Sequence, residues 1–473
     1  MMTRDMPVDG DPRAVRAGEI SWSELIALTD EECRARRTAL ERTQLAKARR
    51  LLSAALDNPF YGPRYAPAGL APHRLESLEQ WRLLPLVEKA DLLADQQAFP
   101  PFGQRLGVSP GEVRQVHLTS GTSGFGQEAF ALTGPDLTVS GSTWQWPLAA
   151  LGLRPGDQFA TMYPVTFLTY GRTLLEGGRL AGVPVVSMAG SDTALAVALM
   201  EHLQPAAIGA RPAFLALVEE HLARRGVLPR DVLRRTKGLL GSGLAPSAVP
   251  ATEERWNSTV HEVYGSSQAG GIIATTAGTG AAPDGAPGIM YCLEDHFLVE
   301  MVDPHTLEPV TAGEAEVVLT CLDRAASPVI RYRTRDRVTL VPPGVDDNRS
   351  PYLGIRVGSI GRFDDMLKIR GNNVWPQQLD EALLGHAGIS DFRAEVTLDA
   401  RGVDVLTVQV RRAAGARALD ELWVEVRQRV KRATNVTPRV ADAPDLPQAA
   451  LKPKRLVDLR SSPVVAAPHT VSP

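Results

Sequence analysis

Apolar and polar positions alternate through the middle of the chain in a pattern typical of a parallel sheet covered by helices. Between residues 156 and 265, short apolar runs are separated by amphipathic stretches. This alternation is typical of crossover units in which helices cover both faces of a parallel sheet. The predicted strands are 158–163, 183–188, 206–210, 238–241 and 260–264. We therefore expect an α/β domain with its site at the strand ends.

A long helix and a β-rich part flank this region. The pattern from about 20 to 57 is helical and predicts one packed face, which carries Leu51, Leu52, Ala55 and Leu56. A Gly/Ala/Pro-rich stretch at 276–288 is followed by antiparallel strand patterns, clearest at 297–302 and 316–322. We expect the β-rich part to cover about 289–360.

The last hundred residues predict a small separate α+β domain. A helix at 376–384 precedes a hairpin formed by 392–398 and 403–410, and a second helix follows. The apolar face of that helix carries Leu419, Leu422, Trp423, Val426 and Val430. We therefore predict a large domain at 1–361, a small domain at 362–460 and a disordered tail at 461–473.

Composition limits the classes of partner. The chain has 473 residues, 44% of them hydrophobic, so it is too long for a single hydrophobic core. Its net charge of −3 creates no strong electrostatic field that would attract nucleic acid or an anionic membrane. The N-terminus shows no signal-peptide pattern, and no stretch approaches the roughly 18 apolar residues of a membrane span. Three cysteines without paired spacing fit free thiols in a reducing compartment. We expect a cytoplasmic protein with small-molecule partners.

A loop of small hydroxyl residues and glycines at 119–126 is the first candidate site. Glycine lets successive N–H groups face one concavity, and hydroxyl groups add donors, so such a loop suits the phosphates of ATP. A plain surface turn is the alternative interpretation. The residues in question are Thr119, Ser120, Gly121, Thr122, Ser123 and Gly124.

Four later segments follow this loop, at 261–268, 330–336, 361–371 and 451–455. Together the five segments resemble the adenylate-forming superfamily, which includes acyl-CoA synthetases, peptide-synthetase adenylation domains and luciferases. A narrower resemblance to the phenylacetate-CoA ligase branch rests on 58–61, 84–92, 294–297 and 328–333. The resemblance covers roughly 45–460 and implies a large domain followed by a small mobile one.

The resemblance assigns nucleotide-binding roles. It implies that Tyr264 stacks on adenine and that Asp336 accepts hydrogen bonds from the ribose hydroxyls, with Arg362 at the same ribose and Gly241 and Gly265 beside the nucleotide. From the residues alone, Tyr264 also suits a core position and Asp336 a salt bridge to a neighbouring arginine.

The resemblance also assigns a hinge and a catalytic cation. Asp364 matches the residue that absorbs the rotation of the small domain, although a turn aspartate is the simpler interpretation. Lys452 matches the lysine that bridges the substrate carboxylate and the α-phosphate, where negative charge builds in the transition state. A solvated basic cluster is the alternative use of Lys452 and Lys454.

Two departures from the family pattern affect the phosphate and metal sites. Phe125 and Gly126 occupy the places of the usual Lys and Pro after the loop. Gln268 occupies the place of the acid that helps to hold Mg²⁺, and a neutral amide contributes no charge to a hard cation site. Thr122 is the other expected metal contact, and Glu262 or a water can compensate for Gln268.

The acid pocket is expected at 163–170. Tyr163, Phe167 and Tyr170 can wall a flat aromatic substrate, and Ser266 is expected to line the same pocket. Arg211 follows a predicted strand and can clamp an anion, although an arginine at a strand end commonly faces solvent. Core packing is an equally good use of the aromatic segment.

These observations support three functional hypotheses. The first is an AMP-forming ligase that uses ATP and Mg²⁺ to adenylate an aromatic carboxylic acid and passes it to coenzyme A. The second is a diazotase of secondary metabolism that adenylates nitrite and diazotises an aryl amine such as an aminobenzoate. The third is a non-catalytic nucleotide-binding relative. A homodimer is expected from the family alone.

Overall fold

The computed structural model describes residues 22–119, 127–243, 245–399, 401–413, 419–446 and 454–460. The chain divides into two compact units, Met1–Ile360 and Gly361–Pro473. We describe each unit by itself. Residues 120–126 of the predicted phosphate loop, Lys452 and the predicted tail 461–473 lie outside the described residues.

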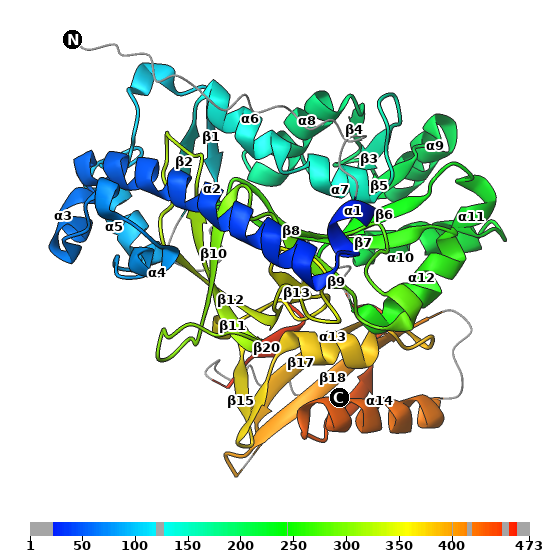
Figure 1. The fold of residues 1–473 in the computed structure, drawn as a ribbon. Coiled ribbons are helices and arrows are strands. Elements are labelled where there is room, and N and C mark those ends of the chain that lie inside the picture. Colours follow the sequence, from blue (N-terminus) through cyan, green and yellow to red (C-terminus); the bar gives the residue numbers. More distant parts are fainter. Residues whose placement is uncertain are drawn as a thin grey trace. The chain divides into compact units, whose positions relative to one another are not determined.

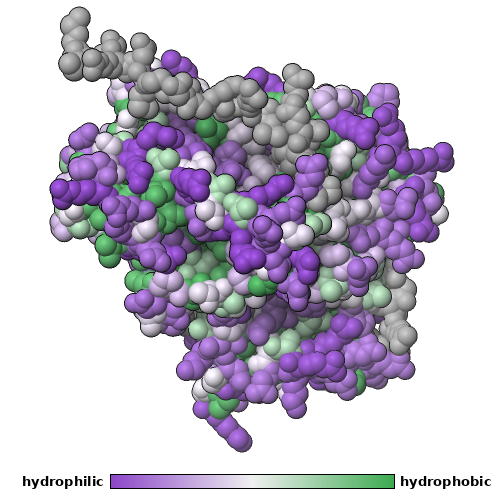
Figure 2. All heavy atoms as spheres, viewed as in Figure 1, coloured by the Kyte–Doolittle hydropathy of each residue, from purple (hydrophilic) through white to green (hydrophobic). Residues whose placement is uncertain are grey.

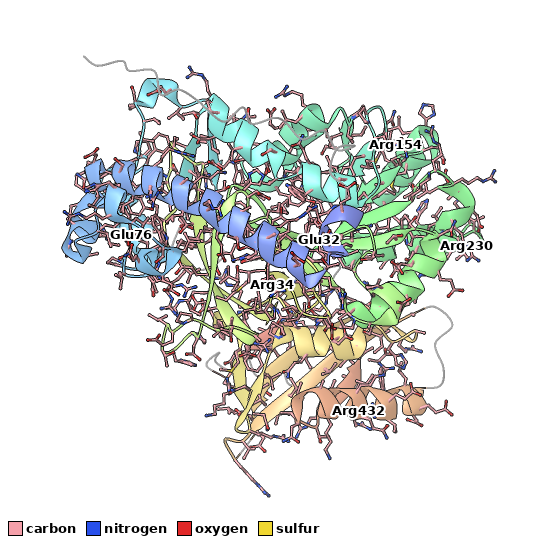
Figure 3. The ribbon with its side chains drawn as sticks, in the orientation of Figure 1. Glu32, Arg34, Glu76, Arg154, Arg230 and Arg432 are labelled. Carbon is pink, nitrogen blue, oxygen red and sulfur yellow. The ribbon has the colours of Figure 1, made fainter. Side chains whose placement is uncertain are left out.

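Helix α2, which follows the short α1, crosses the face of unit 1 in Figure 1. A capping box starts the helix, because Thr29 Oγ1 accepts the N–H of Glu32 while Glu32 Oε2 accepts the N–H of Thr29 at 2.9 Å. Figure 3 shows Glu32 and Arg34 near this end. Leu51, Leu52 and Ala55 are buried as predicted, whereas Leu56 is only partly buried. The helices of unit 1 are α1 (Ser23–Ile26), α2 (Asp30–Asp57), α3 (Gly62–Tyr65), α4 (Leu78–Trp81), α5 (Lys89–Ala98), α6 (Gly134–Ser142), α7 (Gln145–Ala150), α8 (Thr169–Ala181), α9 (Thr193–Leu203), α10 (Pro212–Ala223), α11 (Pro229–Val232) and α12 (Val249–Trp256).

A mixed sheet runs through unit 1 in the order β10-β11-β12-β13-β9-β8-β7-β6-β5-β3-β4. A separate antiparallel hairpin joins β1 (Gln115–Leu118) to β2 (Ala129–Leu132). The strands of the mixed sheet are β3 (Phe159–Thr161), β4 (Val185–Ser187), β5 (Ala207–Gly209), β6 (Gly238–Gly241), β7 (Thr259–Ser266), β8 (Gly271–Thr276), β9 (Ile289–Cys292), β10 (Phe297–Val302), β11 (Gly313–Cys321), β12 (Tyr332–Val341) and β13 (Gly354–Arg356).

The parallel part of this sheet confirms the predicted alternation. β4, β3, β5, β6 and β7 pair in parallel, and Figure 1 shows helices α9 to α12 gathered around them. The antiparallel β-rich part is confirmed as well. The sequence prediction missed β8, which pairs antiparallel with β7 and with β9 and so connects the two parts. One core continues across both parts and includes the fully buried Trp81, Trp144 and Trp256.

Unit 2 is a small α+β domain with its own core. The predicted hairpin and both predicted helices are present, and a parallel strand lies on each side of the hairpin. The elements of unit 2 are β14 (Gly361–Arg362), β15 (Leu367–Ile369), β16 (Asn372–Val374), α13 (Pro376–Leu383), β17 (Ile389–Leu398), β18 (Asp404–Arg412), α14 (Leu419–Thr434), β19 (Arg439–Asp442) and β20 (Leu456–Asp458).

Charged residues occupy the outside of each unit. Figure 2 shows a mostly hydrophilic face with scattered apolar patches, and Figure 3 shows Arg154, Arg230 and Arg432 at the edges of their units. Within the described residues, every helix is too short or too polar to cross a bilayer. The three cysteines are free and buried, which confirms the expectation of free thiols.

A buried histidine makes the stability of unit 1 depend on pH. His117 on β1 is fully buried, and burial together with the positive charges of Arg324 and Arg172 lowers its pKa to about 4. The unfolded chain binds a proton here near pH 6.5, whereas the folded chain does not. This contribution to stability is therefore complete above pH 6.5 and is lost as the pH falls toward 4.

We expect His117→Gln to reduce this pH dependence. Between pH 7 and pH 5 the variant should lose about 1 to 2 kcal/mol less of its free energy of unfolding than the parent. Urea titrations of both proteins at the two pH values measure this difference. Equal losses in parent and variant would assign the pH dependence to other groups, such as the buried His261, whose pKa is also lowered to about 4 by burial.

Candidate active site

A tyrosine and an aspartate from two strands that are separated by β13, β9 and β8 in the sheet order form the centre of the predicted nucleotide site. Tyr264 Oη on β7 donates a hydrogen bond of 2.7 Å to Asp336 Oδ2 on β12. The Tyr264 ring is buried, and burial together with the Asp336 charge raises the pKa of its hydroxyl well above the ordinary value. The hydroxyl therefore stays protonated and fixes one carboxylate oxygen of Asp336.

A bulge in β12 positions Asp336. The pairing of β11 with β12 shifts so that Thr334, Arg335 and Asp336 lie opposite the single residue Val317. Arg335 has a φ of 61°, and the N–H of Asp336 donates to Thr334 Oγ1 at 3.0 Å. A bulge of this kind redirects side chains from the regular alternation. Asp336 thus lies inside the strand β12 and not at its end.

The arginines beside Asp336 bind other carboxylates. Arg333 Nη2 lies 2.7 Å from Glu316 Oε2, and Arg333 Nη1 lies 2.9 Å from Glu88 Oε1. Arg335 also pairs with Glu88, at 3.2 Å. These two arginines thus pair with Glu88 and Glu316, while Asp336 accepts the Tyr264 hydroxyl.

Close backbone approaches shape the ends of β6 and β7. A Cβ on Gly265 would lie 2.6 Å from the carbonyl oxygen of Gly271, so only glycine fits between β7 and β8 at this register shift. Gly241 is the last residue of β6. Glu262 is fully buried and accepts the N–H groups of Gly243, at 2.9 Å, and Gly358, at 3.2 Å. Glu262 thereby organises the segment after β6.

The hairpin β1–β2 carries the predicted phosphate loop, and its base is closed. The N–H of Thr119 donates to the carbonyl of Glu128 at 3.0 Å, and the N–H of Glu128 donates to Thr119 Oγ1 at 2.9 Å. Residues Ser120, Gly121, Thr122, Ser123 and Gly124 lie outside the described part. The ends of the loop are thus fixed next to each other on two paired strands.

Gln268 contacts a carboxylate that the sequence analysis did not single out. Gln268 Nε2 donates a hydrogen bond of 2.7 Å to Glu128 Oε2, and Lys89 Nζ lies 3.6 Å from the same oxygen. Burial raises the pKa of Glu128, while Lys89, the Gln268 hydrogen bond and Arg105 lower it. The feature of the sequence that could have indicated Glu128 is its position as a charged residue immediately before the apolar strand Ala129–Leu132.

Aromatic rings gather where the acid pocket was predicted. The Tyr163 and Tyr170 ring centroids lie 4.2 Å apart at 38°, and Trp144 contacts Tyr170 edge-on at 4.5 Å. Phe167 stands apart from this cluster with a side chain that is 45% exposed. Ser266 Oγ accepts the N–H of Ala269 at 3.1 Å, which stabilises the turn after β7.

Arg211 lies beside the same rings. Its guanidinium carbon is 5.9 Å from the Tyr163 ring centroid, and its buried Nε has no hydrogen-bond partner among the described residues. Burial raises the pKa of Tyr163, whereas Ser242 and Arg211 lower it. Tyr163 and Arg211 follow the paired parallel strands β3 and β5, whose carboxyl ends meet at one edge of the sheet. Arg211 is half-buried, so it differs from a solvent-facing arginine.

The remaining predicted residues belong to unit 2. Arg362 Nη2 lies 3.8 Å from Asp364 Oδ2, and both side chains are largely exposed. Asp364 belongs to the short 3₁₀ helix Phe363–Asp365. Lys452 lies outside the described residues, but Arg455, three positions later, donates to Asp391 Oδ1 at 2.9 Å and precedes β20.

The described residues show no cluster of three or more His, Cys, Asp or Glu side chains that could hold a metal. Mg²⁺ in nucleotide enzymes is commonly held by one or two carboxylates together with substrate phosphates and waters, so a full protein cage is unnecessary. Glu128 and the side-chain carbonyl of Gln268 are oxygen donors at the base of the loop predicted to bind phosphate. This donor set fits a hard divalent cation.

Comparisons with known proteins agree with this arrangement. Residues 371–460 match the family of the AMP-binding enzyme C-terminal domain. A phenylacetate-coenzyme A ligase of Pseudomonas putida is 32% identical over 398 residues, which cover 81% of this chain and 84% of the relative.

Solved structures of 2-hydroxyisobutyryl-CoA ligase have a similar fold. The postadenylation state with 2-HIB-AMP has a TM-score of 0.78 at 26% identity, covering 88% of this chain and 89% of that one. The thioesterification state, with 2-HIB-AMP and CoA, has a TM-score of 0.62 at 26% identity, covering 89% and 90%.

The chain belongs to the phenylacetate-CoA ligase family of adenylate-forming enzymes. It is an ATP-dependent, adenylate-forming ligase.

Proposed function

We propose that this ligase activates an aromatic carboxylic acid and transfers it to coenzyme A. The observation that carries the proposal is the Tyr163–Tyr170 ring pair with Arg211 beside it. A flat ring stacks favourably on such a pair, and the guanidinium attracts an anion in a half-buried position. The cluster follows the carboxyl ends of β3 and β5, as expected for the substrate site of a parallel sheet.

The proposed reaction has two steps. A carboxylate oxygen of the acid attacks the α-phosphorus of ATP, the bond to the bridging oxygen breaks, and pyrophosphate leaves. The thiolate of coenzyme A then attacks the acyl carbon, and AMP leaves with the oxygen that joined it to the acyl group. Asp336 accepts the ribose hydroxyls, the Tyr264 ring stacks on adenine, and Lys452 neutralises charge on the α-phosphate during the first step. Mg²⁺, when bound, neutralises the other phosphates.

We also propose Asp364 as the hinge between the two steps. It lies just beyond the division between the two units and is exposed, so a backbone rotation there disturbs little packing. The postadenylation and thioesterification states named for 2-hydroxyisobutyryl-CoA ligase support such a conformational step in this family.

Pyrophosphate release with a panel of aryl and aliphatic acids, with and without coenzyme A, tests the proposed function. We expect the highest kcat/KM for an aryl acid, with thioester formed when coenzyme A is present. Arg211→Ala should lower kcat/KM for that acid about tenfold or more, because it removes a charged hydrogen-bond donor.

Two further variants control for loss of charge and loss of fold. Arg211→Lys keeps the charge without the planar fork, and we expect an intermediate effect. Arg154→Ala at the edge of the unit should behave as the parent (Figure 3). A preference for small aliphatic acids, unaffected by Arg211→Ala, would contradict an aromatic pocket.

The buried Nε of Arg211, without a partner among the described residues, also favours a second candidate, the ATP-dependent diazotase. In that reaction the arginine holds the carboxylate of an aminobenzoate-type amine, and nitrite attacks the α-phosphorus instead of the acid. AMP formation that requires nitrite and the amine but no coenzyme A would support this candidate. Pyrophosphate release that requires only an acid, followed by AMP release when coenzyme A is added, supports the ligase.

A further inference from the structure

The carboxylate of Glu128 is buried and only half satisfied. Its side chain is wholly inaccessible to solvent. Oε2 accepts the Gln268 amide at 2.7 Å and faces Lys89 Nζ at 3.6 Å, whereas Oε1 has no hydrogen-bond partner among the described residues. A buried carboxylate oxygen without a partner is costly, so native proteins commonly satisfy it with a donor or a cation.

The position of Glu128 in the chain indicates which cation would satisfy its free oxygen. Glu128 closes the base of the β1–β2 hairpin through two hydrogen bonds with Thr119, so its side chain starts where the predicted phosphate loop ends. Gln268 follows Tyr264 by four positions and comes from the segment after β7. The carboxylate is thus placed between the proposed adenine and phosphate positions, where the cation of MgATP is required.

Gln268 is held in a way that presents its amide to Glu128. Arg324 Nη1 donates to the backbone carbonyl of Gln268 and fixes the turn. The side-chain N–H then fixes Glu128 Oε2 and leaves Oε1 as the buried oxygen without a hydrogen-bond partner among the described residues. Lys89, on the Oε2 side, balances part of the buried charge.

We propose that Glu128 supplies the carboxylate ligand for the divalent cation that accompanies ATP, and that Gln268 positions it. In this arrangement the carboxylate at 128, immediately before β2, takes the place of the acid expected at 268. The proposal rests on the adenylation chemistry of the family and is independent of which acid is activated.

Calorimetric titrations with ATP in Mg²⁺ and with ATP in EDTA, without any acid substrate, test this assignment. We expect Glu128→Gln to reduce the enhancement of ATP affinity by Mg²⁺ about tenfold or more, while affinity in EDTA stays near that of the parent. The double variant Glu128→Gln/Gln268→Glu exchanges the two side chains, so the pair still contains one carboxylate and one amide. It should recover most of the enhancement of ATP affinity by Mg²⁺. Glu112→Gln, at an exposed cap before the same hairpin, should match the parent.

Two outcomes would overturn the proposal. An unchanged Mg²⁺ enhancement in folded Glu128→Gln would leave Glu128 as a structural partner of Gln268. Should that variant fail to fold, Gln268→Glu provides the second measurement, because it keeps Glu128 and adds a second carboxylate. The proposal expects Gln268→Glu to bind Mn²⁺ several-fold more tightly in EPR titrations with a non-hydrolysable ATP analogue, and unchanged binding would contradict it.

Discussion

Lys452→Ala is expected to slow formation of the acyl adenylate by about 100-fold or more, because it removes the cation proposed to meet the α-phosphate as charge builds there. The lysine itself lies outside the described residues, but its neighbour Arg455 is anchored in unit 2. Arg455 binds Asp391 at 2.9 Å and Asp380 at 3.5 Å, immediately before β20. Arg455, three positions after Lys452 in the sequence, is therefore fixed within unit 2 by these two carboxylates.

Lys454→Ala provides the matched control for this prediction. Lys454 is exposed, and an exposed cation in water contributes little to a distant charge. Pyrophosphate release in single turnover should fall in Lys452→Ala and remain within about twofold of the parent in Lys454→Ala. Equal losses in both variants would indicate a diffuse basic cluster, and full activity in Lys452→Ala would exclude the assigned role.

The parallel strands β3, β5 and β6 were predictable because they are buried along their whole length and form short apolar runs. β3, β5 and β6 were found for this reason. β8 was missed although every residue in it is buried, because it follows a Gly-Gly pair and ends in threonines that resemble a loop. Whether such a run pairs with β7 depends on distant partners and cannot be inferred from local pattern.

The site illustrates the same limit at the level of single residues. Tyr264 and Asp336 were identified from a family resemblance, but their mutual hydrogen bond depends on a bulge set by the register of β11 against β12. Glu128 was missed because its significance lies in the contact with Gln268, 140 positions away. Residue types suggested the chemistry, whereas the pairing of distant segments determines which groups are satisfied.

Asp336→Ala is expected to lower kcat/KM for ATP about 100-fold, because two charged hydrogen bonds to the ribose, each contributing about 1.5 kcal/mol, are lost together. Tyr264→Phe keeps the ring and removes only the hydroxyl that holds Asp336 Oδ2. One neutral donor to a carboxylate contributes less, so a reduction of about tenfold or less is expected for this variant.

Deoxynucleotides separate a ribose contact from a general loss of structure. The parent should use 2′-deoxy-ATP and 3′-deoxy-ATP less well than ATP. Each of them lacks one of the two hydroxyls that are proposed to donate a hydrogen bond to Asp336. Asp336→Ala should use all three nucleotides almost equally, since the interaction energy between carboxylate and hydroxyl is already absent. If the variant still prefers ATP over both deoxynucleotides by the parental ratio, the carboxylate does not bind the ribose, and its role is confined to ordering Tyr264.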